Sequence, residues 1–196
     1  MRRKTFDTLV SIGGLILAAV LAVAGGLLLW SSSFINGQVH DQLAAQQIYF
    51  PAAGSDAIKG PEFTAMQQYA GQQLTTGAQA EVYADHFIAV HLQEIGGGKT
   101  YSQLSAAAQA DPTNTQLQSQ VATMFKGETL RGMLLNAYAF GTMGKIAGIA
   151  GIVSFAASAV LLVLSLLGLV HARRTAPEAQ LGRAPAIESI PAPATS

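Results

Sequence analysis

Two long apolar runs without a charged side chain constrain this sequence more than any other feature. The first extends from Leu9 to Trp30 over 22 residues, and the second from Ile146 to Val170 over 25 residues. At a rise of 1.5 Å per residue, 22 helical residues measure about 33 Å, which exceeds the hydrocarbon core of a bilayer at about 30 Å. Because lipid offers the backbone no hydrogen bonds, each run is predicted to be a transmembrane α-helix.

The cations that flank the two runs predict their orientation. Positions 2–4 are all basic, positions 173–174 are both arginine, and no cation follows the first run until Lys59. Cytoplasmic flanks of membrane helices carry an excess of lysine and arginine. The sequence therefore predicts that both termini are cytoplasmic and that residues 31–143 are extracytoplasmic, although Lys145 at the outer edge of the second run is a mild counter-signal.

The predicted layout of the chain has five parts. The first run is expected to be an uncleaved anchor, because it exceeds the 7–15 apolar residues of a signal peptide and no A-x-A site follows Trp30. The last segment is rich in proline, alanine, serine and threonine, a composition that predicts disorder. The parts are a cytoplasmic N-terminus (1–8), a transmembrane helix (9–30), an extracytoplasmic helical domain (31–143), a second transmembrane helix (144–170) and a disordered cytoplasmic tail (171–196).

Composition excludes several classes of function. Charged residues make up 11 % of the chain, the net charge is zero, and there is no cysteine. Nucleic-acid binding needs basic clusters, so no nucleic-acid partner is expected. Without cysteine the chain has no disulfide, no thiolate metal site and no cysteine nucleophile. The expected partners are the lipid bilayer and either another membrane protein or a second copy of the chain, and no cofactor is expected.

Both apolar runs carry small residues at helical spacing. In the first run they recur at every fourth position, and in the second a GxxxG pair begins just before the run. Small residues let helices approach closely, and helix association in lipid depends on that packing. The pattern predicts that the two spans pack together or that the chain self-associates, through Gly14, Ala18, Ala22, Gly26, Gly144 and Gly148.

Helix signals dominate the residues between the runs, and no strand-like alternation stands out. Pro61 suits a first helical position, and Thr76 with Gln79 matches a capping box. A broad apolar face follows from Ala80 and ends at the glycines 96–98. The sequence predicts an all-α membrane protein in which a bundle of four to six helices is inserted between two transmembrane helices.

The remaining boundaries follow from the same signals. A short helix is predicted over 101–110, and Asp111-Pro112 is predicted to begin the next one as N-cap and first position. One helix is expected from about Glu128 to His171, and residues 36–48 are expected to continue the first span. Ten aromatic side chains are available for a small core: Tyr49, Phe50, Phe63, Tyr69, Tyr83, Phe87, Tyr101, Phe125, Tyr138 and Phe140.

Two patterns suggest chemistry on first inspection. Residues 96–100, GGGKT, are similar to a phosphate-binding loop, but the motif requires glycine at position 93, which is Gln93, and a preceding strand. These glycines are therefore interpreted as a helix C-cap. His86 and His91 are weak metal candidates, because five residues at 100° each place their side chains about 140° apart on an α-helix.

No pattern of a nucleophile or of a catalytic triad is present, so no catalytic residue is assigned. A candidate contact surface for a partner lies on the outer helix and just before the second span. It comprises Tyr83, Phe87, His91, Glu128 and Arg131.

Three segments carry a resemblance to a known group of proteins. They are EVYADHFIAVHL at 81–92, GKTYS at 98–102 and GETLRGMLLNAY at 127–138. The chain resembles a group of uncharacterised actinobacterial two-span membrane proteins over most of residues 1–171. Some members carry the name aromatic ring-opening dioxygenase subunit, but extradiol ring opening uses iron held by two histidines and a carboxylate, and the residues show no such arrangement.

The expected function is that of a non-enzymatic accessory or scaffold subunit in a bacterial cytoplasmic membrane. One alternative is an extracytoplasmic sensor or ligand-binding module. Another, which the resemblance implies, is a metal-dependent ring-opening enzyme.

Overall fold

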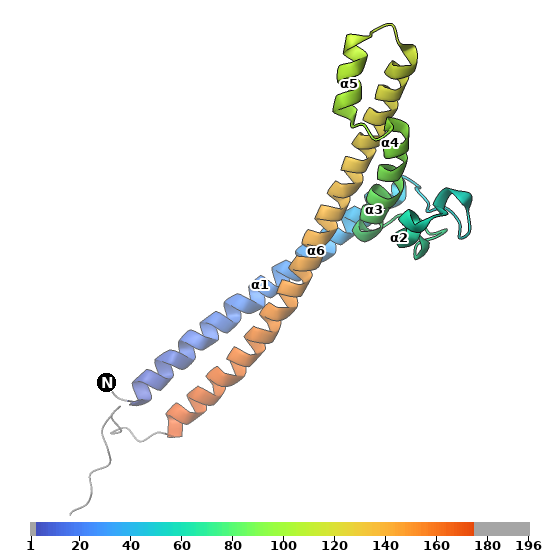
Figure 1. Ribbon diagram of the computed structural model, residues 1–196. Helices are drawn as coiled ribbons and strands as arrows, with labels where there is room; N and C mark the ends of the chain where they lie inside the picture. The colour runs from blue at the N-terminus through green and yellow to red at the C-terminus, as the bar shows by residue number, and fades with distance from the viewer. Residues whose placement is uncertain (1–2, 175–196) are drawn as a thin grey trace, which may run out of the picture. The chain divides into compact units, whose positions relative to one another are not determined.

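The computed structural model describes residues 3–174, and their regular structure is helical (Figure 1). Between positions 3 and 174 there is no β-strand, and an isolated antiparallel bridge joins Tyr49 to Gln73. The all-α class predicted from the sequence is confirmed. Most of the predicted disordered tail, residues 175–196, lies outside the described residues.

Two long helices carry the apolar runs. Helix α1 extends over Arg3–Ala45 (43 residues) and α6 over Thr115–Arg174 (60 residues). Both are long and apolar enough to cross a membrane, and only 11 % of the most apolar stretch of each is buried. The chain divides into two compact units, one ending at Gly26 and resuming at Gly151, the other comprising Leu27–Ala150. The two units are described in turn.

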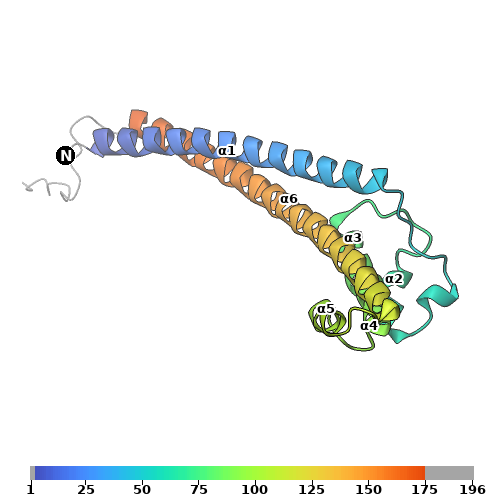
Figure 2. The ribbon, with the colours of Figure 1, turned by 90° about the horizontal axis from the view of Figure 1, so that it is seen from above.

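In the first unit α1 and α6 lie side by side and antiparallel (Figure 2). The hydroxyl of Ser158 donates a hydrogen bond of 2.7 Å to the Ala18 carbonyl. A Cβ atom added to Gly14 would overlap the Ser165 hydroxyl, and a Cβ added to Gly168 would overlap the Ser11 hydroxyl. The two helices therefore pack through small residues, with a serine of each opposite a glycine of the other.

The buried positions of the first unit recur every seven residues rather than every four. A spacing of four drifts about 40° around a helix at each step, whereas a spacing of seven keeps one face toward the partner helix. Of the predicted stripe in α1 only Ala18 is buried, and Gly25 rather than Gly26 lies against the backbone of Gly151. The buried residues are Ser11, Ala18 and Gly25 in α1 and Gly151, Ser158, Ser165 and Ala172 in α6.

The second unit contains the ends of α1 and α6 and all the shorter elements. Here too glycines of α6 face α1, since a Cβ on Gly144 would lie 3.0 Å from Asn36 Oδ1 and one on Gly148 would lie 2.8 Å from Ser32 Oγ. The shorter elements are η1 (Asp56–Ile58), η2 (Pro61–Phe63), α2 (Thr64–Gln67), α3 (Gly77–Tyr83), η3 (Ala84–Ile88), α4 (Ala89–Gly96) and α5 (Tyr101–Ala110).

Several local predictions for the second unit are confirmed. Thr76 and Gln79 form a capping box at the start of α3, and Pro61 is the first residue of η2. Gly97 ends α4 in the left-handed conformation, with φ of 58°. Helix α5 has the predicted bounds, and Thr100 caps its first turn.

Three predicted boundaries are wrong. The last helix begins at Thr115 rather than at Asp111-Pro112, because the Asn114 side chain accepts the Leu117 amide. It then continues through position 128 without a break, so it starts well before the predicted Glu128. Helix α1 ends at Ala45, since Gln47 adopts a positive φ of 53°.

Helix η3 is a π-helical turn that the sequence pattern did not reveal. The Ala89 amide donates to the Ala84 carbonyl, five residues earlier, so this turn holds more residues than an α-helical turn. The assumption of 100° per residue, from which the angle of about 140° between His86 and His91 was predicted, therefore fails over 84–88.

The core of the second unit is mostly aliphatic. Phe50 and Phe63 are buried in it, whereas Tyr49, Phe125 and Phe140 are more than half exposed. The aromatic side chains therefore form only part of the core that was predicted from them. The buried cluster comprises Val39, Leu43, Phe50, Ile58, Phe63, Met66, Leu74, Ala80, Ala84, Ile88, Leu92, Leu104, Met124 and Leu134.

Candidate functional site

The outer-helix residues proposed as a contact surface, Tyr83, Phe87 and His91, form a row of rings that contact one another at tilted angles within the second unit. The ring centroids of Tyr83 and Phe87 are 4.9 Å apart, and those of Phe87 and His91 are 4.4 Å apart. Phe50 meets Tyr83 edge-on at 5.3 Å, and Phe63 lies 6.1 Å from His91. Through these contacts Phe50 and Phe63 pack against the rings of α3, η3 and α4.

Each of the two histidines forms a hydrogen bond through one ring nitrogen, and the two bonds go to different backbone carbonyls. His91 Nδ1–H donates to the Phe87 carbonyl at 2.7 Å, and His86 Nδ1–H donates to the Glu62 carbonyl at 3.3 Å. Among the described residues no group of three or more histidine, aspartate or glutamate side chains could hold a metal ion. The structure therefore assembles no metal centre from this pair.

The two charged members of the proposed surface join α6 to η3. Arg131 forms an ion pair of 2.8 Å with Asp85, and its other terminal nitrogen lies 3.8 Å from Glu128. The three side chains are only about one-third to under one-half exposed. The five predicted contact residues thus fall into two groups that contact other parts of the same chain: the three rings contact Phe50 and Phe63, and the charged pair on α6 contacts Asp85 of η3.

The GGGKT segment serves as a helix end and a helix start. The Gly97 and Gly98 amides donate to the Glu94 and Gln93 carbonyls, so they do not point toward a bound phosphate. The Thr100 hydroxyl accepts the Gln103 amide. These contacts confirm the interpretation of the glycines as a C-cap.

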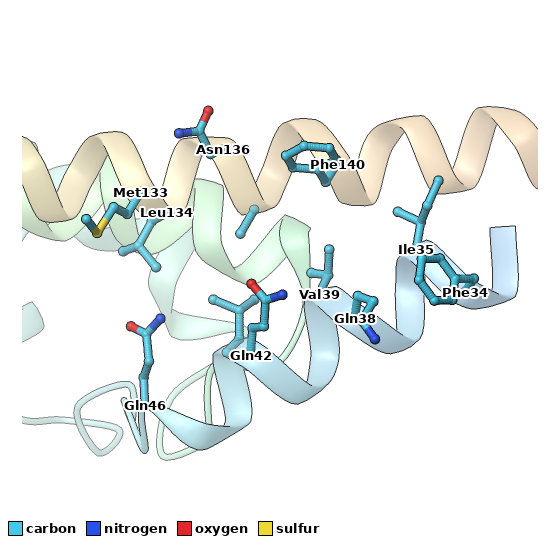
Figure 3. Close-up of a pocket in the computed structure, with 12 residues that line it drawn as sticks. Phe34, Ile35, Gln38, Val39, Gln42, Gln46, Met133, Leu134, Asn136 and Phe140 are labelled. Carbon is cyan, nitrogen blue, oxygen red and sulfur yellow. The ribbon is translucent and has the colours of Figure 1, made fainter. Parts of the chain in front are cut away.

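A groove between α1 and α6 was missed in the sequence. It has a volume of about 510 Å³, within the range of small-molecule sites. Figure 3 shows Val39 and Gln42 of α1 and Leu134 of α6 facing the same space. We call it the α1–α6 groove, and its lining consists of Phe34, Ile35, Gln38, Val39, Gln42, Leu43, Gln46, Met133, Leu134, Asn136, Ala137 and Phe140.

The side chains that line the α1–α6 groove are all uncharged. None of its twelve lining side chains is ionisable, and the only polar groups are the amides of three glutamines and one asparagine. Buried Val39, Leu43 and Leu134 form an apolar floor, whereas Met133 is 62 % exposed and Phe140 56 % exposed at the edge. Such a surface can bind an apolar group and offers no acid, base or nucleophile.

One sequence signal could have indicated the groove. Between positions 34 and 46 the residues that line the groove are spaced by three and four. Apolar side chains and glutamines alternate along this face of α1. The matching face of α6 comes about a hundred residues later, and only the fold shows that the two faces meet.

Tyr83 gives the second unit a pH dependence. Burial raises the pKa of its hydroxyl above the ordinary value of 10.0. The unfolded chain therefore ionises at lower pH than the folded chain, so stability that is present below about pH 10 is lost as the pH rises further. We expect the melting temperature of Tyr83→Phe to fall less steeply than that of wild type between about pH 9 and pH 11.

Tyr49→Phe is the matched control, because Tyr49 is 57 % exposed. Its melting temperature should fall in parallel with that of wild type. Equal slopes for wild type and Tyr83→Phe would contradict the prediction.

No protein-family model matches this sequence, and neither a curated protein sequence nor a solved structure shows significant similarity to it.

Proposed function

We propose that this chain is a non-enzymatic integral membrane protein that serves as an accessory or scaffold subunit of a membrane or cell-envelope complex. The observation that carries the proposal is the sidedness of α1 and α6. Each buries small residues against the other and exposes large apolar ones, including Val23 at 65 % and Ile152 at 64 %. Lipid is the solvent that such a surface fits.

The low burial of the two apolar stretches supports their proposed role as membrane spans. A core helix of a soluble protein is mostly buried, whereas only 11 % of each apolar stretch is buried here. A signal sequence lies near the N-terminus, whereas α6 begins at Thr115. Cations at 2–4 and 173–174 support cytoplasmic termini, with residues 31–143 outside.

The absence of cysteine from the chain allows a direct test of this orientation. Thr5→Cys and Ala53→Cys each introduce one thiol at an exposed position. In intact cells a membrane-impermeant maleimide should label Ala53→Cys, and Thr5→Cys should react only after lysis. The reverse pattern would overturn the orientation, and release of the chain from membranes by alkaline carbonate would overturn the membrane assignment.

The scaffold role requires a partner. Crosslinking and mass spectrometry of native membranes should yield a stoichiometric companion protein or a homo-oligomer. A chain that elutes as a lone monomer in mild detergent and has no crosslinked companion would contradict this role.

A second candidate function is that of an extracytoplasmic ligand-binding module, and the α1–α6 groove favours it. A reproducible thermal shift of the full chain with a water-soluble small molecule would support this function over the scaffold role.

A further inference from the structure

We propose that the α1–α6 groove binds the hydrocarbon tail of a membrane phospholipid, drawn upward from the bilayer along α1 and α6. This inference rests on the membrane location proposed above. It adds a ligand and a site to that location.

The lining of the groove selects an uncharged, apolar ligand. A charged ligand would lose its hydration without gaining a counter-charge, since none of the twelve lining residues is ionisable. Each CH₂ group that leaves water for an apolar surface strengthens binding by about fourfold. The exposed apolar surface that a hydrocarbon chain would cover in the groove belongs to Phe34, Met133 and Phe140.

The length of the groove suits one lipid tail. Its lining on α1 extends from Phe34 to Gln46, which is about 18 Å at 1.5 Å per residue. A bilayer core of about 30 Å contains two layers of tails, so one tail occupies about 15 Å. The lining on α6 extends from Met133 to Phe140, about 10 Å, so a tail can lie along the α1 wall and contact α6 over about two-thirds of its length.

The groove is continuous with apolar surface at the predicted end of the first span. Trp30 stacks on Phe34 with ring centroids 5.6 Å apart, and Phe34 is the first groove residue on α1. Within the same unit Leu27, Ile146 and Ile149 are about 60 % exposed. A tail that leaves the bilayer beside these residues meets the exposed rings of Trp30 and Phe34 before it reaches the groove.

The rim of the groove favours a tail over a partner helix. Gln38, Gln42 and Gln46 are exposed on one face of α1. A helix has a diameter of about 10 Å or more with its side chains, so it would cover these amides and remove their water. A single tail is narrow enough to fill the floor and leave the amides hydrated.

Photolabelling tests the proposal on the full chain. We would reconstitute the protein in phosphatidylcholine vesicles that contain a phosphatidylcholine with a diazirine at the end of one acyl chain, then map adducts by mass spectrometry. We expect adducts on the span residues and also on Leu43, Gln46 and Met133 at the far end of the groove. Met133 lies 11 residues before Gly144, which is about 16 Å along a helix and beyond ordinary contact with the bilayer.

Two variants of the groove have matched controls on the same helix. Met133→Glu places a carboxylate at the edge of the groove, and Ala137→Phe adds a large ring to its lining. Ala139 is exposed and does not line the groove, so Ala139→Glu and Ala139→Phe are the controls. Adducts on Leu43 should fall about tenfold or more in Met133→Glu, because a charge is costly against hydrocarbon, and should stay unchanged in both controls.

The outcomes separate this proposal from the membrane assignment. Span adducts without any on Leu43, Gln46 or Met133 would overturn the groove proposal and leave the chain in the membrane. Equal Leu43 adducts in Met133→Glu, Ala137→Phe and wild type would also overturn it, as would a crosslinked partner helix that occupies the groove. A complete lack of span adducts would overturn the membrane assignment itself.

Discussion

Replacing Leu74 with alanine should destabilise the second unit by about 3 kcal/mol, which lies within the range for a fully buried leucine. The Leu74 side chain has no exposed surface, and its backbone amide donates to the Ile48 carbonyl at 2.8 Å. Truncation leaves a cavity beside the backbone pairing of residues 48–50 with residues 72–74, which holds together the two ends of the segment between α1 and α3. The near-ultraviolet circular dichroism of the tyrosines should report a melting temperature about 10 °C lower.

The matched control is Leu130→Ala, since Leu130 is 38 % exposed. Its melting temperature should change by a small fraction of the Leu74→Ala shift. Equal shifts for the two variants would mean that Leu74 is not part of a packed core.

Gly25→Leu should destabilise the helix pair of the first unit by about 2 kcal/mol, because overpacking of a close contact forces the backbones apart. A Cβ at Gly25 would lie 3.0 Å from the Phe155 ring and 3.1 Å from the Gly151 carbonyl oxygen. The backbone atom cannot move aside by rotation of a side chain. Dyes on Thr5→Cys and Arg174→Cys would report separation of α1 and α6 by energy transfer during titration with dodecyl sulfate.

Gly13→Leu tests the same substitution without the contact. A Cβ on Gly13 meets no atom within 4 Å, so this variant should separate at the wild-type detergent concentration. If Gly13→Leu and Gly25→Leu separate at the same concentration, the antiparallel packing of the two helices is wrong.

The fold could be predicted from the sequence where the signal is local. The length of a charge-free run, the capping box at Thr76 and the left-handed Gly97 depend on residues close together in the chain, and all three are observed. The π-turn over 84–88 has no such local signature in the sequence. The same limit explains Gly25, whose role depends on the position of Phe155 and Gly151 across the helix pair.

The candidate site was less predictable than the fold. The apolar periodicity after Ala80 identified Tyr83, Phe87 and His91 as one face, but it could not show that Phe50 and Phe63 cover that face. The groove depends on a second helix a hundred residues away. The sequence predicted the two walls as helical continuations of the two spans, at 36–48 and from about Glu128 onward, and could not show that they face each other.

The alternation of serine and glycine between α1 and α6 determines the alignment of the two helices. Ser165 occupies the space that Gly14 leaves open, and Ser11 does the same at Gly168. Sliding one helix by a heptad would bring Ser165 opposite Leu21, where no such space exists. Leucines that face lipid are equally suited to many alignments. The two serine–glycine contacts, Ser165 with Gly14 and Ser11 with Gly168, therefore favour one register of α1 against α6.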